Sequence, residues 1–94
     1  MVHQLKIKEE YFEGLVSGKK TFEIRKNDRD FKVGDFLALN EFNGLTTTGR
    51  TTLFKISYLF DNPEFLQSGY VVLGIIPCNI VQCAKPAILK DGDF

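Results

Sequence analysis

Cysteine and histidine are scarce in this sequence, which limits the kinds of site that it can build. The only residues of these types are Cys78, Cys83 and His3, whereas a structural zinc site needs about four ligands. On an extended segment, two cysteines five positions apart point to opposite faces, which suits neither a disulfide nor a shared metal. We therefore expect reduced thiols, no metal site and no cofactor.

Long apolar runs and common catalytic motifs are also missing. The longest apolar run, from Tyr70 to Pro77, is far too short to cross a membrane, and the N-terminal residues lack the apolar stretch of a secretory signal. We therefore expect a cytoplasmic protein without membrane association. No Walker loop, dinucleotide-binding fingerprint, nucleophile elbow or zinc-finger spacing is present, so no common motif assigns a reaction.

An excess of charge of either sign is absent as well. Twelve Lys and Arg residues balance twelve Asp and Glu residues, which argues against strong attraction to a phosphate backbone over the whole surface. The charges are unevenly placed, because nine of the cations and eight of the acids lie within residues 1–50. We therefore expect polar function to concentrate in the first half of the chain.

The pattern of apolar residues predicts one short helix among five or six strands. The helix is expected at 9–18, because its first turn is acidic and Gly18 suits a left-handed stop. Its expected apolar face consists of Tyr11, Phe12, Leu15 and Val16. The strands are expected at 3–8, 20–26, 36–42, 50–61 and 70–76, with a last strand or edge at 78–83.

This order of elements contains no strand–helix–strand alternation of the kind that builds a parallel sheet. We predict a mostly β (α+β) fold, a small and mostly antiparallel curved sheet or barrel with one early helix. Its 94 residues suit one domain, 1–94, with a core of about 3–83 and a C-terminal tail at 84–94. Leu5 and Ile7, and later Phe31 and Val33, are expected to face the core.

The segment from Lys19 to Asp30 is the main candidate for a functional site, because it mixes five cations with three acids. As a strand, it would place Thr21, Glu23, Arg25 and Asn27 on one face. The other face would present Phe22 and Ile24, which we expect to anchor the strand on the core. Side chains two residues apart emerge about 6.5–7 Å apart, close enough for a salt bridge between Glu23 and Arg25.

These residue types suit the recognition of a nucleoside or nucleotide. The guanidinium of Arg25 matches phosphate oxygens or the acceptor edge of a base, with Lys20 and Arg29 as further cations. A carboxylate such as Glu23 accepts hydrogen bonds from a base amino group, which an all-basic patch does not. Strict alternation places Lys20 beside Phe22, so Lys20 joins the site only if the chain bends at Gly18. The alternative to a binding site is an ordinary solvated strand face whose charges pair across the sheet.

Stacking partners for bases are harder to identify. Tyr11, Tyr58 and Tyr70 are candidates, although we expect each of them to be a half-buried core residue.

Several segments together resemble a small bacterial and phage family without an assigned function, which belongs to the ASCH (activating signal cointegrator homology) group of the PUA-like superfamily. The resemblance covers about residues 3–76. The matching segments are His3–Lys6, the helix from Tyr11 to Lys20, Thr21–Arg29, Val33–Asp35 and Gly69–Leu73. The run Glu-Ile-Arg-Lys-Asn-Asp-Arg at 23–29 is the most specific part.

The resemblance implies a PUA-like β-barrel with a cleft beside the helix and second strand that binds RNA or a modified nucleoside. By position, Lys20, Glu23 and Arg25 would line that cleft, and Asn27 and Arg29 would lie at its rim. Some small ASCH proteins are amidohydrolases that act on acylated cytidine. They resemble this chain at Lys20 and Arg25, but have a threonine where this sequence has Glu23.

Three functions follow as hypotheses. The first is an RNA- or nucleotide-binding module, with the predicted contact residues Lys20, Thr21, Glu23, Arg25, Asn27 and Arg29. The second is a small nucleoside amidohydrolase in which Lys20 and Glu23 supply acid–base chemistry. The third is an accessory domain that binds another protein, which zero net charge permits.

Overall fold

The computed structural model describes residues 1–78 of the chain. Its elements are β1 (Val2–Lys8), α1 (Glu9–Val16), β2 (Phe22–Lys26), β3 (Phe36–Phe42), β4 (Thr47–Phe60) and β5 (Tyr70–Pro77). No helix within these residues is long and apolar enough to cross a membrane. The predicted tail at 84–94, and all of the predicted last strand except Cys78, lie outside the described residues.

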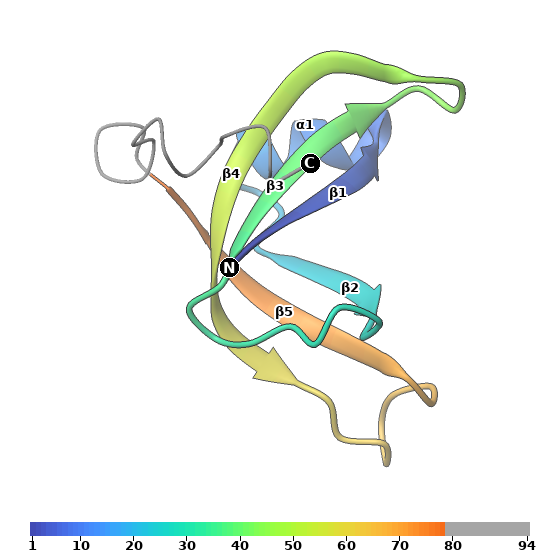
Figure 1. Cartoon of the computed structure of the whole chain (residues 1–94), viewed down its shortest axis with the longest axis vertical. Coiled ribbons are helices and arrows are strands. Elements are labelled where there is room, and N and C mark those ends of the chain that lie inside the picture. The colour runs from blue at the N-terminus through green and yellow to red at the C-terminus, as the bar shows by residue number, and fades with distance from the viewer. Residues whose placement is uncertain (79–94) are drawn as a thin grey trace.

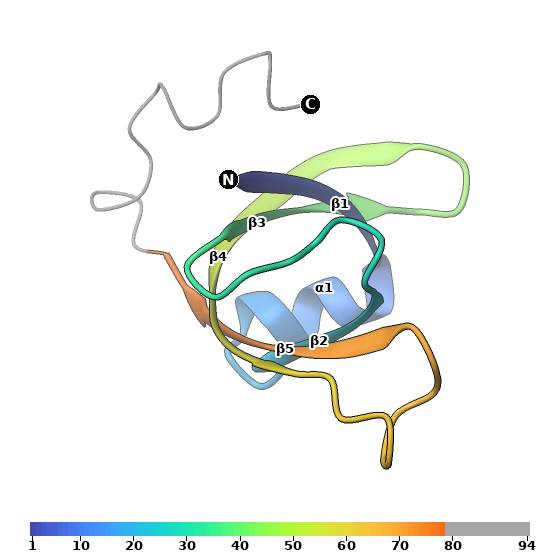
Figure 2. The same ribbon diagram turned by 60° about the horizontal axis from the view of Figure 1, so that its bottom comes forward.

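The five strands form one sheet in the order β1-β3-β4-β5-β2, which curls into a half-barrel (Figure 1). Only β1 and β3 pair in parallel, and the other neighbouring strands are antiparallel. This confirms the predicted mostly β, barrel-like fold with one early helix. The two edge strands, β1 and β2, are separated along the chain by little more than α1. Seen end-on, the sheet curves around α1 (Figure 2).

The core fills the concave face of the sheet and receives α1. On β5, Val71 and Leu73 are fully buried, because inward-facing residues alternate along a strand. Leu5 and Ile7 of β1 are also buried, as predicted. The complete cluster consists of Leu5, Ile7, Phe12, Leu15, Phe31, Leu37, Leu39, Phe54, Ile56, Val71, Leu73 and Ile75.

Helix α1 buries a narrower face than its sequence indicates. Phe12 and Leu15 are each 2% exposed, whereas Tyr11 and Val16 are 46% and 47% exposed. The prediction of a four-residue buried face was therefore wrong, because a helix of about two turns meets a curved sheet along a narrow stripe. Val33 also remains exposed, at 60%, since the loop before β3 buries only Phe31.

Strand boundaries differ modestly from the predictions. The second strand begins at Phe22 rather than at residue 20, because the chain is still turning after the helix. The fourth strand begins at Thr47 rather than at residue 50. Its hairpin with β3 is closed by Asn43, whose side-chain oxygen accepts hydrogen bonds from the N–H groups of Leu45 and Thr46 at 2.9 and 3.0 Å.

Candidate functional site

A pocket of about 560 Å³ lies at the free edge of β2. Its volume falls within the range of small-molecule sites, about 300–1,000 Å³. Because β1 also contributes to its wall, the pocket lies between the two edge strands of the sheet. The lining residues are Lys6, Ile7, Lys8, Tyr11, Lys20, Phe22, Glu23, Ile24, Arg25, Lys26 and Tyr70.

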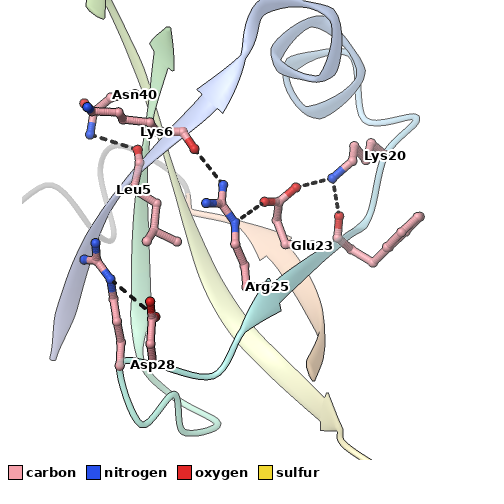
Figure 3. Close-up of polar contacts among 9 residues, drawn as sticks. Leu5, Lys6, Lys20, Glu23, Arg25, Asp28 and Asn40 are labelled. Carbon is pink, nitrogen blue, oxygen red and sulfur yellow. Dashed lines mark hydrogen bonds and ion pairs between the residues drawn. The ribbon is translucent and has the colours of Figure 1, made fainter. Parts of the chain in front are cut away.

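Glu23 is the buried centre of the polar groups in this pocket. It is only 4% exposed, and both of its carboxylate oxygens are engaged (Figure 3). Arg25 Nε donates to Oε2 at 2.9 Å, and the Lys20 ammonium contacts Oε1. The predicted Glu23–Arg25 salt bridge is confirmed. Pairing on both sides compensates the cost of burying this carboxylate.

Arg25 also links β2 to the opposite edge of the sheet. Its Nη2 donates to the backbone carbonyl oxygen of Lys6 on β1 at 2.8 Å (Figure 3). A guanidinium offers five N–H donors, and these two hydrogen bonds use only part of them. Arg25 is therefore held in one orientation while it keeps N–H groups for a ligand.

The side chains of β2 alternate between two faces as predicted, but the polar residues rather than the apolar ones face the inside of the sheet. In the register with β5, Glu23 lies opposite Leu73 and Arg25 opposite Val71, and both β5 residues are fully buried. Glu23 and Arg25 therefore share the inner face of the sheet. The prediction that Phe22 and Ile24 anchor the strand on the core was wrong, since they are 44% and 54% exposed.

Lys20 joins the cluster because the chain bends where the helix ends. Gly18 adopts a φ of 82°, and the N–H of Lys20 then donates to the carbonyl oxygen of Gly14 at 2.8 Å. The Lys20 ammonium donates to the carbonyl oxygen of Phe22 at 2.7 Å. It also lies 5.6 and 5.1 Å from the ring centroids of Tyr11 and Phe22, within cation–π range. The bend that the sequence required at Gly18 is present.

The other predicted site residues do not line the pocket. Thr21 is exposed, and its carbonyl oxygen accepts a hydrogen bond from the N–H of Ile75 at 3.1 Å. The side-chain oxygen of Asn27 accepts from the N–H of Phe31 at 3.1 Å, which stabilises the turn after β2. Arg29 Nη1 donates to the carbonyl oxygen of Gln4 at 2.8 Å. Ligand contacts by Thr21, Asn27 and Arg29 stay predictions.

The sequence analysis did not predict that β1 lines the pocket. Lys6 and Lys8 alternate with buried Leu5 and Ile7, so the sequence indicates that they face away from the core. Only the curl of the sheet brings their strand to the free edge of β2. Tyr11 and Tyr70, considered as stacking partners, do line the pocket. Tyr58 is 65% exposed rather than half-buried in the core, and it lies outside the pocket.

A second polar cluster, outside the pocket, joins the β3–β4 hairpin to α1. Glu41 is 5% exposed and accepts a hydrogen bond from Thr48 Oγ1 at 2.6 Å. Arg50 lies 3.6 Å from the Glu41 carboxylate and donates to Glu13 Oε1 on α1 at 3.0 Å. The Arg50 guanidinium also lies 4.7 Å from the centre of the Phe12 ring. We interpret this cluster as support for α1, because its charged groups are paired with one another.

Metal ligation has no candidate within residues 1–78, where no three His, Cys, Asp or Glu side chains form a group that could hold an ion.

Comparison with known proteins identifies relatives without an assigned function. Over 72 residues the chain is 36% identical to the "Uncharacterized 12.9 kDa protein in GpA 3'region" of Escherichia phage P2. That match covers 77% of this chain and 65% of the phage protein. The fold is similar to the crystal structure of hypothetical protein PH0355, with a TM-score of 0.58 and 19% identity over 83% of this chain and all of that chain.

The match to a family model is more extensive. Residues 2–75 match the model described as "Domain of unknown function (DUF3850)", a span that includes every strand and the pocket apart from the last residues of β5. The chain therefore belongs to the DUF3850 family.

Proposed function

We propose that the pocket binds a nucleotide, either free or as one unit of an RNA strand, within a fold of the ASCH group of the PUA-like superfamily. The observation that carries the proposal is the arrangement of Glu23 and Arg25 in a pocket of about 560 Å³ with aromatic walls. The buried carboxylate orients the guanidinium, so the hydrogen-bonding groups are arranged before a ligand arrives. Such preorganisation lowers the entropic cost of binding.

The charge of the pocket differs from that of the whole chain. Five lining residues are cationic, whereas Glu23 is the one acidic residue among them. The formal net charge of the chain is zero. A local excess of positive charge attracts a phosphate group to the pocket, whereas the zero net charge of the chain does not favour non-specific binding of polyanions over the whole surface.

The aromatic residues of the pocket provide contacts for the base of the nucleotide. Tyr11, Phe22 and Tyr70 come from three different elements and line the same pocket. Aromatic rings stack on nucleobases with little dependence on the base. Cations for the phosphate and rings for the base together suit a nucleotide better than an inorganic anion.

Titrations with nucleoside monophosphates and with short single-stranded RNA test this proposal. Arg25→Ala should weaken binding by about 5- to 150-fold, which corresponds to about 1–3 kcal/mol for a lost bidentate arginine contact. Lys32→Ala is the matched control, because Lys32 is also a cation but does not line the pocket. Circular dichroism checks that each variant is folded. Equal affinity of the wild-type protein and folded Arg25→Ala would rule out this site.

An amidohydrolase that acts on acylated cytidine is the second candidate. The direct contact between Lys20 and Glu23 inside the pocket favours it, since such a pair can exchange a proton. Two observations weigh against it. Both oxygens of Glu23 are already engaged, and no Ser, Thr or Cys from residues 1–78 lines the pocket as a nucleophile.

Incubation with acylated cytidine and chromatographic detection of the deacylated product separates the two functions. Turnover that disappears in Glu23→Gln would favour the hydrolase. Binding of the nucleoside without turnover would support the binding module.

A further inference from the structure

The outward face of β2, β5 and the second half of β4 carries apolar side chains from all three strands. Paired residues of antiparallel strands project to the same face of a sheet. Phe22 lies opposite Gly74, and Gly74 lies opposite Tyr58. In the next row the paired residues are Ile24, Val72 and Phe60.

Several of these side chains are well exposed. Tyr58 is 65%, Ile24 54%, Ile76 49% and Phe22 44% exposed. Single exposed apolar residues are ordinary, but a contiguous group on one face marks an interaction surface.

Gly74 gives this face its shape. A Cβ atom at this position would lie 3.2 Å from the Cβ of Tyr58, so glycine permits the close approach of β4 to β5. It also leaves a strip without side chains between Phe22 and Tyr58. These two residues lie two strands apart, or about 10 Å, because neighbouring strands are about 4.8 Å apart. Phe22 and Tyr58 therefore lie on either side of a position that carries no side chain.

The charges on this face have one sign. Lys26 extends outward from β2 and Lys55 from β4, and the Lys20 ammonium lies 5.1 Å from the centre of the Phe22 ring. No carboxylate occurs among the outward-facing residues of these three strand segments, all of which the structure describes. Acidic residues follow in the loops beyond these strands, with Asp28 and Asp30 after β2 and Asp61 and Glu64 after β4.

The face is continuous with the pocket. Phe22, Ile24, Lys26 and Tyr70 belong to the outward side of their strands and also line the pocket. A chain that leaves the pocket over the edge of β2 therefore meets the ring of Phe22 first and that of Tyr58 beyond it.

We propose that this outward face is a stacking platform for single-stranded nucleic acid, one nucleotide of which occupies the pocket. This inference rests on the proposed nucleotide-binding function. Exposed rings with cations and no acids match the polyanionic backbone and the bases of a single strand. A second copy of the chain is a poorer occupant, because a symmetric interface would bring lysines toward lysines without acidic partners.

The test compares a mononucleotide with longer strands. Uridine monophosphate reaches only the pocket, whereas oligouridylate RNA and oligothymidylate DNA of equal length also reach the platform. Tyr58→Ala should weaken oligonucleotide binding by about 5- to 150-fold, the range for one lost base–aromatic stack, and should leave mononucleotide binding unchanged. Tyr58→Phe, which keeps the ring, should bind as the wild-type protein does. The RNA and DNA arms show which sugar is preferred.

Leu45→Ala is the control for loss of an exposed apolar group, since Leu45 is 92% exposed at the tip of the β3–β4 hairpin. Unchanged oligonucleotide affinity in Tyr58→Ala, or an oligonucleotide that binds no tighter than the mononucleotide, would overturn the platform. Sedimentation that shows a dimer lost in Tyr58→Ala, at unchanged nucleic-acid affinity, would assign the face to a second copy instead.

The two proposals fail in different ways. Oligonucleotide binding that depends on Arg25 but not on Tyr58 keeps the pocket and overturns the platform. Binding that depends on Tyr58 but not on Arg25 supports the platform and contradicts the pocket. No binding of either probe overturns both.

Discussion

Arg29 donates a hydrogen bond from Nη1 to the backbone carbonyl oxygen of Gln4 at 2.8 Å. Arg25 makes the same kind of bond to the carbonyl oxygen of Lys6, also at 2.8 Å. Carbonyl groups two residues apart point to the same edge of a strand, so both arginines bind the edge of β1 that faces away from β3. Two guanidinium groups, one from β2 and one from the loop after it, thus bind the edge of β1 where no strand–strand ladder exists.

Replacing Arg29 tests whether it joins the strands or contacts the ligand. Arg29→Gln should lower the free energy of unfolding by about 1 kcal/mol, the value of one hydrogen bond, in urea denaturation. If Arg29 only stabilises the edge of β1 and does not contact the ligand, nucleotide affinity falls slightly and the salt dependence of binding stays unchanged. A direct phosphate contact would instead reduce the salt slope by about one unit. A reduced salt slope would therefore show that Arg29 contacts the ligand.

Removing the Glu23 carboxylate should cost more stability than replacing any one cation of the pocket. Glu23→Gln leaves the Lys20 ammonium and the Arg25 guanidinium close together without a compensating charge. We expect a loss on the order of 3 kcal/mol in urea denaturation, at the lower end for a broken buried pair because the two cations are partly exposed. Adding Lys20→Met should recover part of this loss, since one unpaired cation is then gone. Equal stability of Glu23→Gln and wild type would contradict the interpretation of Glu23 as the centre of the cluster.

Gly14 controls the position of Lys20. A Cβ atom on Gly14 would lie 3.2 Å from the Cβ of Lys20, so an alanine requires the helix and Lys20 to separate by a few tenths of an ångström. Alanine also favours the helix by about 1 kcal/mol, which offsets the crowding. Gly14→Ala should therefore keep its stability to within about 1 kcal/mol while nucleotide affinity falls. An unchanged affinity would show that this crowding does not displace the Lys20 ammonium.

Gly18 provides the matched comparison. It adopts a φ of 82°, and no atom lies within 4 Å of a Cβ placed there, so any penalty is conformational rather than steric. Gly18→Ala should lower the free energy of unfolding by about 1 kcal/mol, and Gly18→Asn by less, because asparagine tolerates the left-handed region. Thermal or urea denaturation of the three proteins measures this. The opposite order would contradict the conformational explanation.

Asp35 should make folding sensitive to acid. Burial of its carboxyl group opposes ionisation, but this is outweighed by a hydrogen bond from His3 Nε2 at 2.8 Å, one from the N–H of Lys32, and the charges of His3 and the N-terminus. Together they hold the pKa of Asp35 below its ordinary value of 3.8. The stabilisation is therefore complete above that value and is lost as the pH falls through the lowered pKa.

Unfolding measured across the acid range checks this sign. The stability difference between wild type and Asp35→Asn should shrink as the pH falls below about 5. Asp30→Asn is the control, because Asp30 is highly exposed, at 83% of its side chain. A difference that grows toward low pH would contradict the lowered pKa.

Much of the local structure follows from the sequence. The period of the apolar residues located α1 and five strands to within a few residues, because alternation and helical spacing are local properties. The same alternation placed Glu23 and Arg25 on one face of β2 and predicted their salt bridge. The turn at Gly18 was visible in its residue type, because glycine alone adopts positive φ without cost.

Only the tertiary structure decided which face of β2 is the inner one. Alternation separates Glu23 and Arg25 from Phe22 and Ile24, but it does not say which pair meets the core, and hydrophobicity favoured the wrong pair. The inner side of β2 lies at the open edge of the half-barrel, where β1 offers carbonyl oxygens in place of a paired strand. Charged side chains satisfy these groups and Phe and Ile do not, so the polar face turned inward and the apolar face met solvent.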